Sequence, residues 1–341
     1  MPAISRRKFL ALGTGALFIS WYRPPGRIVT VNGTIDSFRL GRTLIHEHVL
    51  VDFIGADFTG FHRWDRNDVI EAVAPWFIEA KKAGVKSIVE CTPAFLGRDA
   101  RLLKMLSDKT GVKLITNTGY YGAVQNKYLP RWAFTESAEQ LAARWIDDFE
   151  YGIDGTNVRP GFIKISVDAD AAGLSDLHKK IVRAAAITHL KTGLTIYSHT
   201  GPAAAAFEEI EILKKEKVHP SALVWVHAQA EKDMSQYVKA AKMGTWVSLD
   251  NVNTSDISRY VEALTLLKEN GLLDRVLISH DAGYYRPGEK NGGEFTGYTA
   301  IFTHLIPALT EKGFTKRDIR RLLDKNPEEA LELRVKRYRG D

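Results

Sequence analysis

The sequence predicts an α/β protein built as a single (β/α)8 barrel, the TIM-barrel fold. Short β-branched runs alternate with longer amphipathic runs along almost all of the chain, which is typical of parallel strands joined by helices. Eight strand candidates occur within the 341 residues, and eight is the number that one barrel needs. A doubly wound open sheet is the alternative, but such a sheet usually has fewer strands.

The individual elements follow from their local patterns. The strand candidates are, in chain order, TLIHEHVL, KSIVECT, KLITNTGYY, FIKISVD, LTIYSHT, ALVWVHA, TWVSLDNV and VLISHDAG. Between them lie helix-like stretches such as DVIEAVAPWFIEAKKAG, DARLLKMLSDKTG and SRYVEALTLLKENG, several of which begin near Asp or Ser and end at Gly. The longest irregular stretches, at about 120–135 and 283–297, follow the third and eighth strands. We expect them to form the rim and the lid of a pocket.

The first 25 residues predict an export signal and not a part of the fold. A basic start is followed by an apolar run that is too short for a membrane-spanning helix. The arginine pair Arg6 and Arg7, followed by Lys8, Phe9 and Leu10, resembles the twin-arginine signal of bacteria, which directs folded proteins to the periplasm. A basic arm with an incidental arginine pair is the alternative. We expect residues 26–341 to form one barrel domain in the periplasm.

Composition excludes several classes of protein. With 45% hydrophobic and 26% charged residues the chain is ordinary globular material, neither disordered nor fibrous. The formal charge of +6 is spread along the chain and forms no basic stripe, so we expect no nucleic-acid partner. We also expect no stable insertion into a membrane. The single cysteine, Cys91, excludes an intrachain disulfide.

Two histidines in the first predicted strand, His46 and His48, are separated by one residue. Successive side chains of a strand point to opposite faces, so both imidazoles share one face and Glu47 takes the other. Two neutral imidazoles on one face are suited to binding a metal ion. A pair of hydrogen-bonded histidines without a metal is the alternative.

Three further polar residues lie at the ends of predicted strands. His199 closes the fifth strand, His227 closes the sixth, and Asp281 follows the eighth. In a (β/α)8 barrel the active site is built at the carboxyl ends of the strands, so these residues should meet the two histidines of the first strand at one mouth. Four histidines and a carboxylate are a ligand set that zinc prefers. We therefore predict a metal site.

Lys164 lies within the apolar stretch GFIKISVD, on the barrel-facing side if Phe162 and Ser166 also point inward. Burying an ammonium group there is costly unless it is paired, neutralised or modified. Three interpretations are open: a structural lysine, a Schiff-base lysine, or a lysine carboxylated by CO2 that bridges two metal ions. The nearby histidines favour the third interpretation, because a carbamate would give a negative charge to each of two divalent ions.

The complete pattern resembles the phosphotriesterase family of the amidohydrolase superfamily. It is carried by the segments TLIHEHV, GRD, TGYYGA, GFIKI, SHTG, SHDAGYY and KNPEEAL, which span almost the whole chain after the predicted signal. The resemblance implies a site for two divalent ions, zinc first and manganese, cobalt or iron as alternatives. It implies that His46, His48 and Asp281 hold one ion, that His199 and His227 hold the other, and that carboxylated Lys164 and a hydroxide bridge them. It is also compatible with a homodimer.

The resemblance implies hydrolysis in which the bridging hydroxide attacks the substrate and Asp281 takes up the proton. Two positions bear on the substrate. Where phosphotriesterases proper have a histidine, this chain has Asn251, which cannot relay a proton at pH 7. Tyr121 occupies the place of a tyrosine found in lactonases of the family, so its hydroxyl is a catalytic candidate; a rim aromatic is the alternative. We therefore expect a small lactone or carboxylic ester as substrate, with an organophosphate as a weaker one.

Other functions remain alternatives at this stage. A phosphotriesterase proper or an amide hydrolase could use the same site. A lyase could form a Schiff base on Lys164 and would then work without metal. A barrel that binds a ligand without turnover belongs to another class, since a fold alone does not secure a function. The complete ligand set argues against that class.

Overall fold

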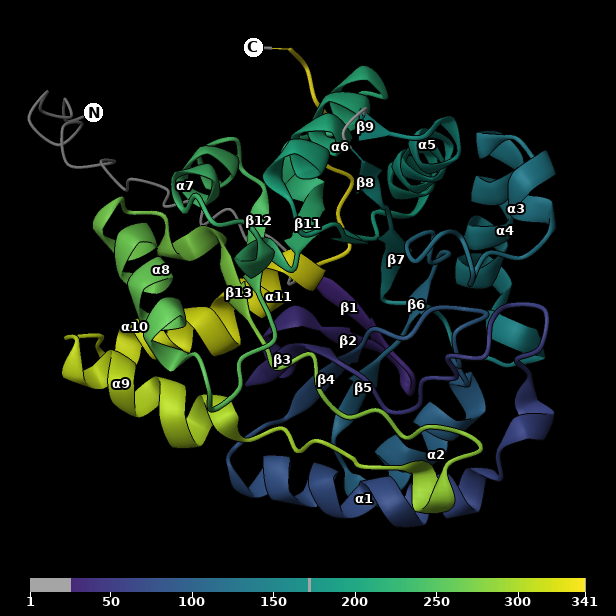
Figure 1. Ribbon diagram of the computed structural model, residues 1–341, viewed down its shortest axis with the longest axis horizontal. Coiled ribbons are helices and arrows are strands. Elements are labelled where there is room, and N and C mark those ends of the chain that lie inside the picture. Colours follow the sequence, from purple (N-terminus) through teal and green to yellow (C-terminus); the bar gives the residue numbers. More distant parts are fainter. Residues whose placement is uncertain (1–25, 171–172, 341) are drawn as a thin grey trace, which may run out of the picture.

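The computed structural model describes residues 26–170 and 173–340, and the predicted export signal at 1–25 lies outside them. The described chain forms the predicted TIM barrel, with helices arranged around a central ring of strands (Figure 1). The barrel strands are β3 (Thr43–Glu47), β4 (Ser87–Glu90), β5 and β6 (Lys113–Ile115 and Asn117–Thr118), β7 (Phe162–Ser166), β10 (Ile196–His199), β11 (Leu223–Val226), β12 (Trp246–Leu249) and β13 (Val276–Ile278). The third barrel strand is therefore interrupted, and β5 and β6 share it.

Parallel pairing connects the barrel strands in chain order. β3, β4 and β5 form one sheet, and β6, β7, β10, β11, β12 and β13 form the other. Two backbone hydrogen bonds close the barrel between its first and last strands, from Asp281 N to His46 O (3.0 Å) and from His48 N to Ala282 O (2.8 Å). The seam therefore runs through the residues that the sequence predicts as metal ligands.

The helices cover the outside of the barrel. They are α1 (Arg66–Lys82), α2 (Ala100–Thr110), α3 (Trp132–Thr135), α4 (Ala138–Tyr151), α5 (Asp176–Thr192), α6 (Ala203–Lys215), α7 (Ser235–Lys242), α8 (Ile257–Glu269), α9 (Ile306–Glu311), α10 (Lys316–Arg320) and α11 (Asn326–Leu331). α2 begins and ends as the sequence predicts. The Asp99 carboxylate accepts hydrogen bonds from backbone amides of the first turn, and Gly111 ends the helix with φ of 71°. Among the described helices, none has the length and apolar character to cross a membrane.

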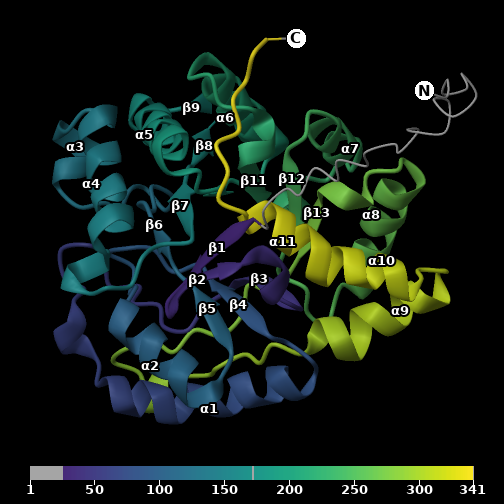
Figure 2. The same ribbon diagram turned by 180° about the vertical axis from the view of Figure 1, so that it is seen from behind.

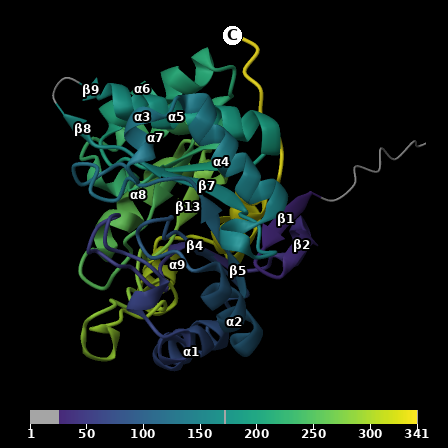
Figure 3. The same ribbon diagram turned by 90° about the vertical axis from the view of Figure 1, so that its right-hand side faces the viewer.

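An antiparallel hairpin that the strand pattern does not predict covers one end of the barrel. Its strands are β1 (Arg27–Thr30) and β2 (Gly33–Asp36). Ile28 is buried in the same interior cluster as Ile45 and Phe162, so the hairpin closes the end where the barrel strands begin. Seen from behind, it lies across the strand ring (Figure 2), and in side view it lies at one edge of the molecule (Figure 3). A second short hairpin, β8 (Ala169–Asp170) and β9 (Gly173–Leu174), follows β7.

Long loops follow three of the barrel strands at the opposite end. The predicted irregular stretches at 120–135 and 283–297 are present, although the first contains the short helix α3. A third loop, residues 48–60 after β3, was not singled out by the sequence pattern. These loops leave the carboxyl ends of the strands at the mouth of the barrel, where an active site is expected.

Candidate metal centre at the barrel mouth

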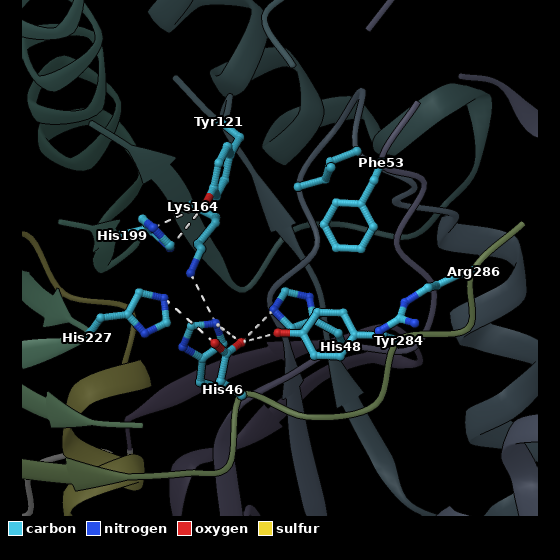
Figure 4. Close-up of a pocket in the computed structure, with 11 residues that line it drawn as sticks. His46, His48, Phe53, Tyr121, Lys164, His199, His227, Tyr284 and Arg286 are labelled. Carbon is cyan, nitrogen blue, oxygen red and sulfur yellow. Dashed lines mark hydrogen bonds and ion pairs between the residues drawn. The ribbon is translucent and has the colours of Figure 1, made fainter. Parts of the chain in front are cut away.

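A cavity of about 210 Å³ opens at the carboxyl ends of the strands. It contains all six side chains that the sequence predicts as metal ligands, and Figure 4 shows five of these, His46, His48, Lys164, His199 and His227, pointing toward one another. The complete lining is His46, His48, Phe53, Leu96, Tyr121, Lys164, His199, His227, Asp281, Tyr284 and Arg286. Residues from β3, β7 and β10 and from the chain directly after β3, β11 and β13 thus meet at one place.

The first strand places two histidines in the cavity through an irregularity in its pairing. The register between β3 and β4 shifts between Leu44 and Glu47. Ile45 packs in the barrel interior and the next residue, His46, also points inward, as two successive residues can at a β-bulge. His46 and His48 consequently line the cavity, and their Nε2 atoms lie 3.3 and 3.0 Å from Oδ1 of Asp281. One carboxylate oxygen therefore faces both imidazoles.

Asp250, at the end of β12, orients two of the histidines from behind. Its carboxylate is fully buried and contacts Nδ1 of His46 at 2.9 Å and Nδ1 of His227 at 2.6 Å. These contacts leave both Nε2 atoms directed into the cavity, which is how carboxylates orient metal-binding histidines. Burial alone would raise the pKa of Asp250, but the two histidines hold it far below its ordinary value. The sequence analysis did not predict this role, although the position of Asp250 after β12 matches that of Asp281 after β13.

Asp281 is held in place by a carboxylate on the other face of β3. Glu47 accepts hydrogen bonds from the Ser279 hydroxyl (2.8 Å), the His280 amide (3.1 Å) and the Ala282 amide (3.0 Å). Its Oε1 also lies 2.7 Å from Nδ1 of His280. Asp281 itself has φ of 51°, a left-handed conformation that costs a non-glycine residue free energy. The contacts on both sides of Asp281 stabilise this conformation.

Lys164 extends into the cavity from the inner face of β7. It is almost completely buried, and its Nζ lies 3.4 Å from Nε2 of His46. Burying an ammonium group costs free energy unless an opposite charge lies beside it. The neighbouring imidazole does not supply such a charge. A carbamate on Nζ would remove the positive charge and add oxygen ligands to the centre. The donor set around Lys164 therefore fits a pair of divalent ions.

Burial keeps two of the candidate ligands uncharged. It lowers the pKa of His46 to about 4, with Lys164 acting in the same direction, and it lowers the pKa of His199 well below its ordinary value, with His227 adding to the effect. Neutral imidazoles are the form that binds metals. Donor atoms of His46, His227 and Asp281 lie within 4.8 Å of one another. His46 and Asp281, which the family resemblance assigns to one ion, thus lie close to His227, which it assigns to the other.

Tyr121 lies above this cluster on the loop after β6. Its hydroxyl is 3.1 Å from Nε2 and 3.2 Å from Nδ1 of His199, so it lies between the two nitrogens and is not aligned with one of them. Burial raises the pKa of Tyr121, and the hydroxyl therefore stays protonated and able to donate a hydrogen bond to a ligand in the cavity.

The remaining histidines of the described chain lie outside the cavity lining. His280 points away, as strand alternation predicts, and its Nε2 accepts from the amide of Ile301. His178 and His189 are buried between helices and loops with backbone partners.

Comparison with known proteins places this site in a family. A model of the phosphotriesterase family matches residues 26–331, which include all six candidate ligands. The chain belongs to the phosphotriesterase family. Members of the phosphotriesterase family are metal-dependent hydrolases with two metal ions, so the family and the ligand geometry agree on the class of reaction.

Individual phosphotriesterase-family relatives cover nearly the whole chain at low identity. The phosphotriesterase homology protein of Escherichia coli is 28% identical over 86% of this chain and 98% of its own length. An aryldialkylphosphatase of Saccharolobus solfataricus is 29% identical, covering 86% of this chain and 96% of its own. The human N-acetyltaurine hydrolase is 25% identical, covering 90% and 98%.

A solved phosphotriesterase-family structure gives the same result. The crystal structure of the Escherichia coli phosphotriesterase homology protein, described with phosphate in its active site, superposes with a TM-score of 0.73 at 26% identity. The superposition covers 86% of this chain and 99% of that one. The relatives thus include proteins named for phosphotriester and for amide hydrolysis, and family membership alone leaves the substrate open.

Proposed function

We propose that the protein hydrolyses a small lactone or carboxylic ester with the help of two divalent metal ions. The observation that carries this proposal is the single cavity that combines the six candidate ligands with a protonated tyrosine hydroxyl. Organophosphate hydrolysis would be a weaker activity of the same site. The proposal goes beyond family membership, which supports a metal-dependent hydrolase without naming the bond.

We assign the metal ligands as the sequence suggests. His46, His48 and Asp281 would hold one ion, His199 and His227 would hold the second, and Lys164 would bridge them as a carbamate. Zinc fits this set of nitrogen and oxygen donors, and manganese, cobalt or iron would also fit. Two such ions would supply a hydroxide nucleophile near neutral pH and polarise the carbonyl oxygen of the substrate.

The chain itself would position the substrate and move the proton. Phe53, Leu96 and the ring of Tyr284 form an apolar wall of the cavity, which would exclude water from the reacting group. The Tyr284 hydroxyl donates to Oδ1 of Asp281 at 2.7 Å. Tyr121 would donate a hydrogen bond to the ester oxygen. Asp281 lies beside His46 and His48. It would take up the proton of the attacking hydroxide and pass it to the leaving alkoxide as the carbon–oxygen bond breaks.

Asn251 supports a carbonyl substrate over a phosphotriester. It follows Asp250 and is exposed, with φ of 79°. Its neutral amide can donate and accept hydrogen bonds but does not exchange a proton at pH 7. No titratable group is therefore available at this position to pass a proton from Asp281 to solvent.

An amide is the second candidate substrate. The relatives named N-acetyltaurine hydrolase favour it, because N-acetyltaurine is an amide and these proteins match 90% of this chain. The same metals, tyrosine and aspartate would serve an amide, provided that the leaving amine also receives a proton.

The test is metal content combined with turnover before and after chelation. We expect two metal ions per chain, and hydrolysis of a γ-lactone, an acyl-homoserine lactone or an aryl ester faster than that of paraoxon or an acyl amide. Chelation should abolish turnover and added zinc should restore it. Faster hydrolysis of the amide would replace the ester proposal by the amide one.

A lysine variant tests the bridge directly. Lys164→Ala should lose at least one ion per chain and lower kcat by about 10³-fold, since metal ions stabilise the transition state by several kcal/mol. Lys191→Ala, which changes an exposed lysine on α5, is the matched control and should change neither. Turnover that survives chelation, with borohydride trapping of a carbonyl substrate on Lys164, would instead indicate a Schiff-base lyase.

We also propose export through the twin-arginine pathway and a homodimer in solution. Residues 1–25, which carry the export prediction, lie outside the described residues. Replacing Arg6 and Arg7 together by lysine should keep the protein in the cytoplasm, and unchanged periplasmic recovery would contradict the proposal. Light scattering at working concentrations would decide between monomer and dimer.

A further inference from the structure

The cavity contains one cationic side chain that the proposed chemistry does not use. Six of its lining residues are candidate metal ligands, and Phe53, Leu96, Tyr121 and Tyr284 supply aromatic and aliphatic surface. Arg286 is the remaining lining residue, and its side chain is drawn in Figure 4. A permanent positive charge at the rim of an otherwise apolar wall calls for an explanation.

The backbone that carries Arg286 is fixed to the barrel. Tyr285 exchanges backbone hydrogen bonds with the chain after β3, from its amide to Val49 O (3.0 Å) and from the Val51 amide to its carbonyl (3.0 Å). The Arg286 amide donates to Gly292 O at 2.8 Å. Arg286 therefore lies on an extension of the β3 and β13 seam, and its side chain projects over the cavity from an anchored position.

The Arg286 guanidinium has unused hydrogen-bonding capacity. Within the described residues it makes no hydrogen bond, and its ion pair is a contact of 3.7 Å to Glu289, with the two side chains 39% and 50% exposed. Such an exposed, loose pair contributes little. Arg63, on the neighbouring loop, is the contrast: its guanidinium donates to both oxygens of Asp52 and to Pro287 O. Arg63 is already satisfied, whereas Arg286 can bind a ligand.

We propose that the substrate carries an anionic group, a carboxylate or a sulfonate, and that Arg286 binds this group at the rim. This inference rests on the proposed function, since it assumes that the scissile carbonyl lies at the metal ligands. A cavity of about 210 Å³ is small enough for one ligand to reach both ends. A planar guanidinium binds two oxygens of such a group at once, so it would also orient the carbonyl.

Matched pairs of aryl acetates test this inference on the metal-loaded full-length protein. 4-Sulfophenyl acetate is compared with 4-(methylsulfonyl)phenyl acetate, and 4-acetoxybenzoate with 4-acetoxybenzamide. The members of each pair differ in charge at similar size, and dividing each kcat/KM by the rate of spontaneous hydrolysis of the same ester corrects for leaving-group reactivity. We expect a higher kcat/KM for the anionic member of at least one pair, and the better pair identifies whether a sulfonate or a carboxylate is preferred.

Variants of the rim assign the preference to Arg286. Arg286→Gln should lower kcat/KM for the anionic ester by about 10- to 100-fold, mainly through KM, and leave the neutral ester within about twofold. Arg286→Lys should restore part of the loss. Glu289→Gln removes the competing carboxylate and should raise kcat/KM for the anionic ester. Equal preference for both esters in the wild type, or equal losses on both in Arg286→Gln, would overturn the inference.

A binding measurement separates this inference from the proposed function. Calorimetry compares 4-methylbenzenesulfonate and 4-methylbenzoate with their neutral counterparts, methyl 4-tolyl sulfone and 4-methylbenzamide. If no ester is hydrolysed, the proposed hydrolysis fails, but tighter binding of an anion that is lost in Arg286→Gln would still support the anion site. Equal binding of anionic and neutral ligands would overturn the site, whatever the turnover.

Discussion

The base and the rim of the cavity are built in different ways. At the base, His46, Lys164 and Asp250 extend from strands or strand ends, are buried, and contact one another or a shared partner. At the rim, Phe53 and Arg286 extend from loops and remain partly exposed. Groups that perform chemistry need fixed positions, whereas groups that select a substrate need only a suitable surface. The reaction class is therefore determined at the base and the substrate at the rim.

Among the residues that support the candidate ligands, the largest effect is expected from the buried carboxylate of Asp250. Asp250→Asn cannot accept from both His46 and His227 as a carboxylate does, so metal affinity should fall by about 10- to 100-fold. Competition with a chelating dye measures this affinity. Asp256→Asn, the same change at an exposed position, is the control. Unchanged affinity in Asp250→Asn would mean that the base does not depend on this contact.

A pH effect on stability is expected from Glu209, which lies on α6 behind β10 and receives hydrogen bonds from Ser198 and Thr200. Burial raises its pKa to about 7, against these hydrogen bonds. Since the unfolded carboxyl titrates near its ordinary value of 4.5, protonated Glu209 favours the folded state at low pH, and about 2 kcal/mol of this is lost between pH 5 and pH 7.

Denaturation at pH 5, 6, 7 and 8 measures the Glu209 effect. Glu209→Gln does not titrate, so its free energy of unfolding should fall less between pH 5 and pH 7 than that of the wild type. Glu211→Gln, at an exposed position on the same helix, should follow the wild type. Parallel curves for all three proteins would show that Glu209 is charged in the folded state throughout this range.

The smallest effect, a change in kcat/KM, is expected from Tyr121, which lies between the base and the rim of the cavity. Tyr121→Phe removes one neutral hydrogen-bond donor and should lower kcat/KM for a lactone by about two- to tenfold, with metal content unchanged. Tyr128→Phe is the control, because the Tyr128 ring packs against that of Tyr121, with 5.8 Å between the ring centroids, and does not line the cavity. A loss of metal in Tyr121→Phe would instead assign Tyr121 a role in holding His199.

Sequence periodicity was sufficient to predict the barrel and the meeting of the candidate ligands. Eight alternating runs specify the strands, and residues at the ends of parallel strands must share one mouth. The β1 and β2 hairpin was missed because it lies outside the alternation of barrel strands and helices, although Asn32 and Gly33 at its turn are a typical hairpin signal. The conformation of the loop that carries Arg286 could not be predicted either, because loops lack periodicity.

The supporting carboxylates were missed for another reason. Asp250 and Glu47 act through partners that are distant in sequence: Glu47 and His280 are 233 residues apart. A single sequence offers no pattern that links such positions. Their role becomes visible only when the first and last strands are placed side by side.

The pairing of the first barrel strand with the last determines when the predicted metal centre can form during synthesis. Synthesis proceeds from the N-terminus, so His46, His48 and Glu47 emerge early and Asp281 emerges only near the end. An unfinished chain therefore lacks both a ligand and the contacts of Glu47 that hold it, and it cannot complete the predicted metal centre. Metal loading would then report that the last strand has docked on the first. Such a late signal of completion would suit the proposed export of the folded protein.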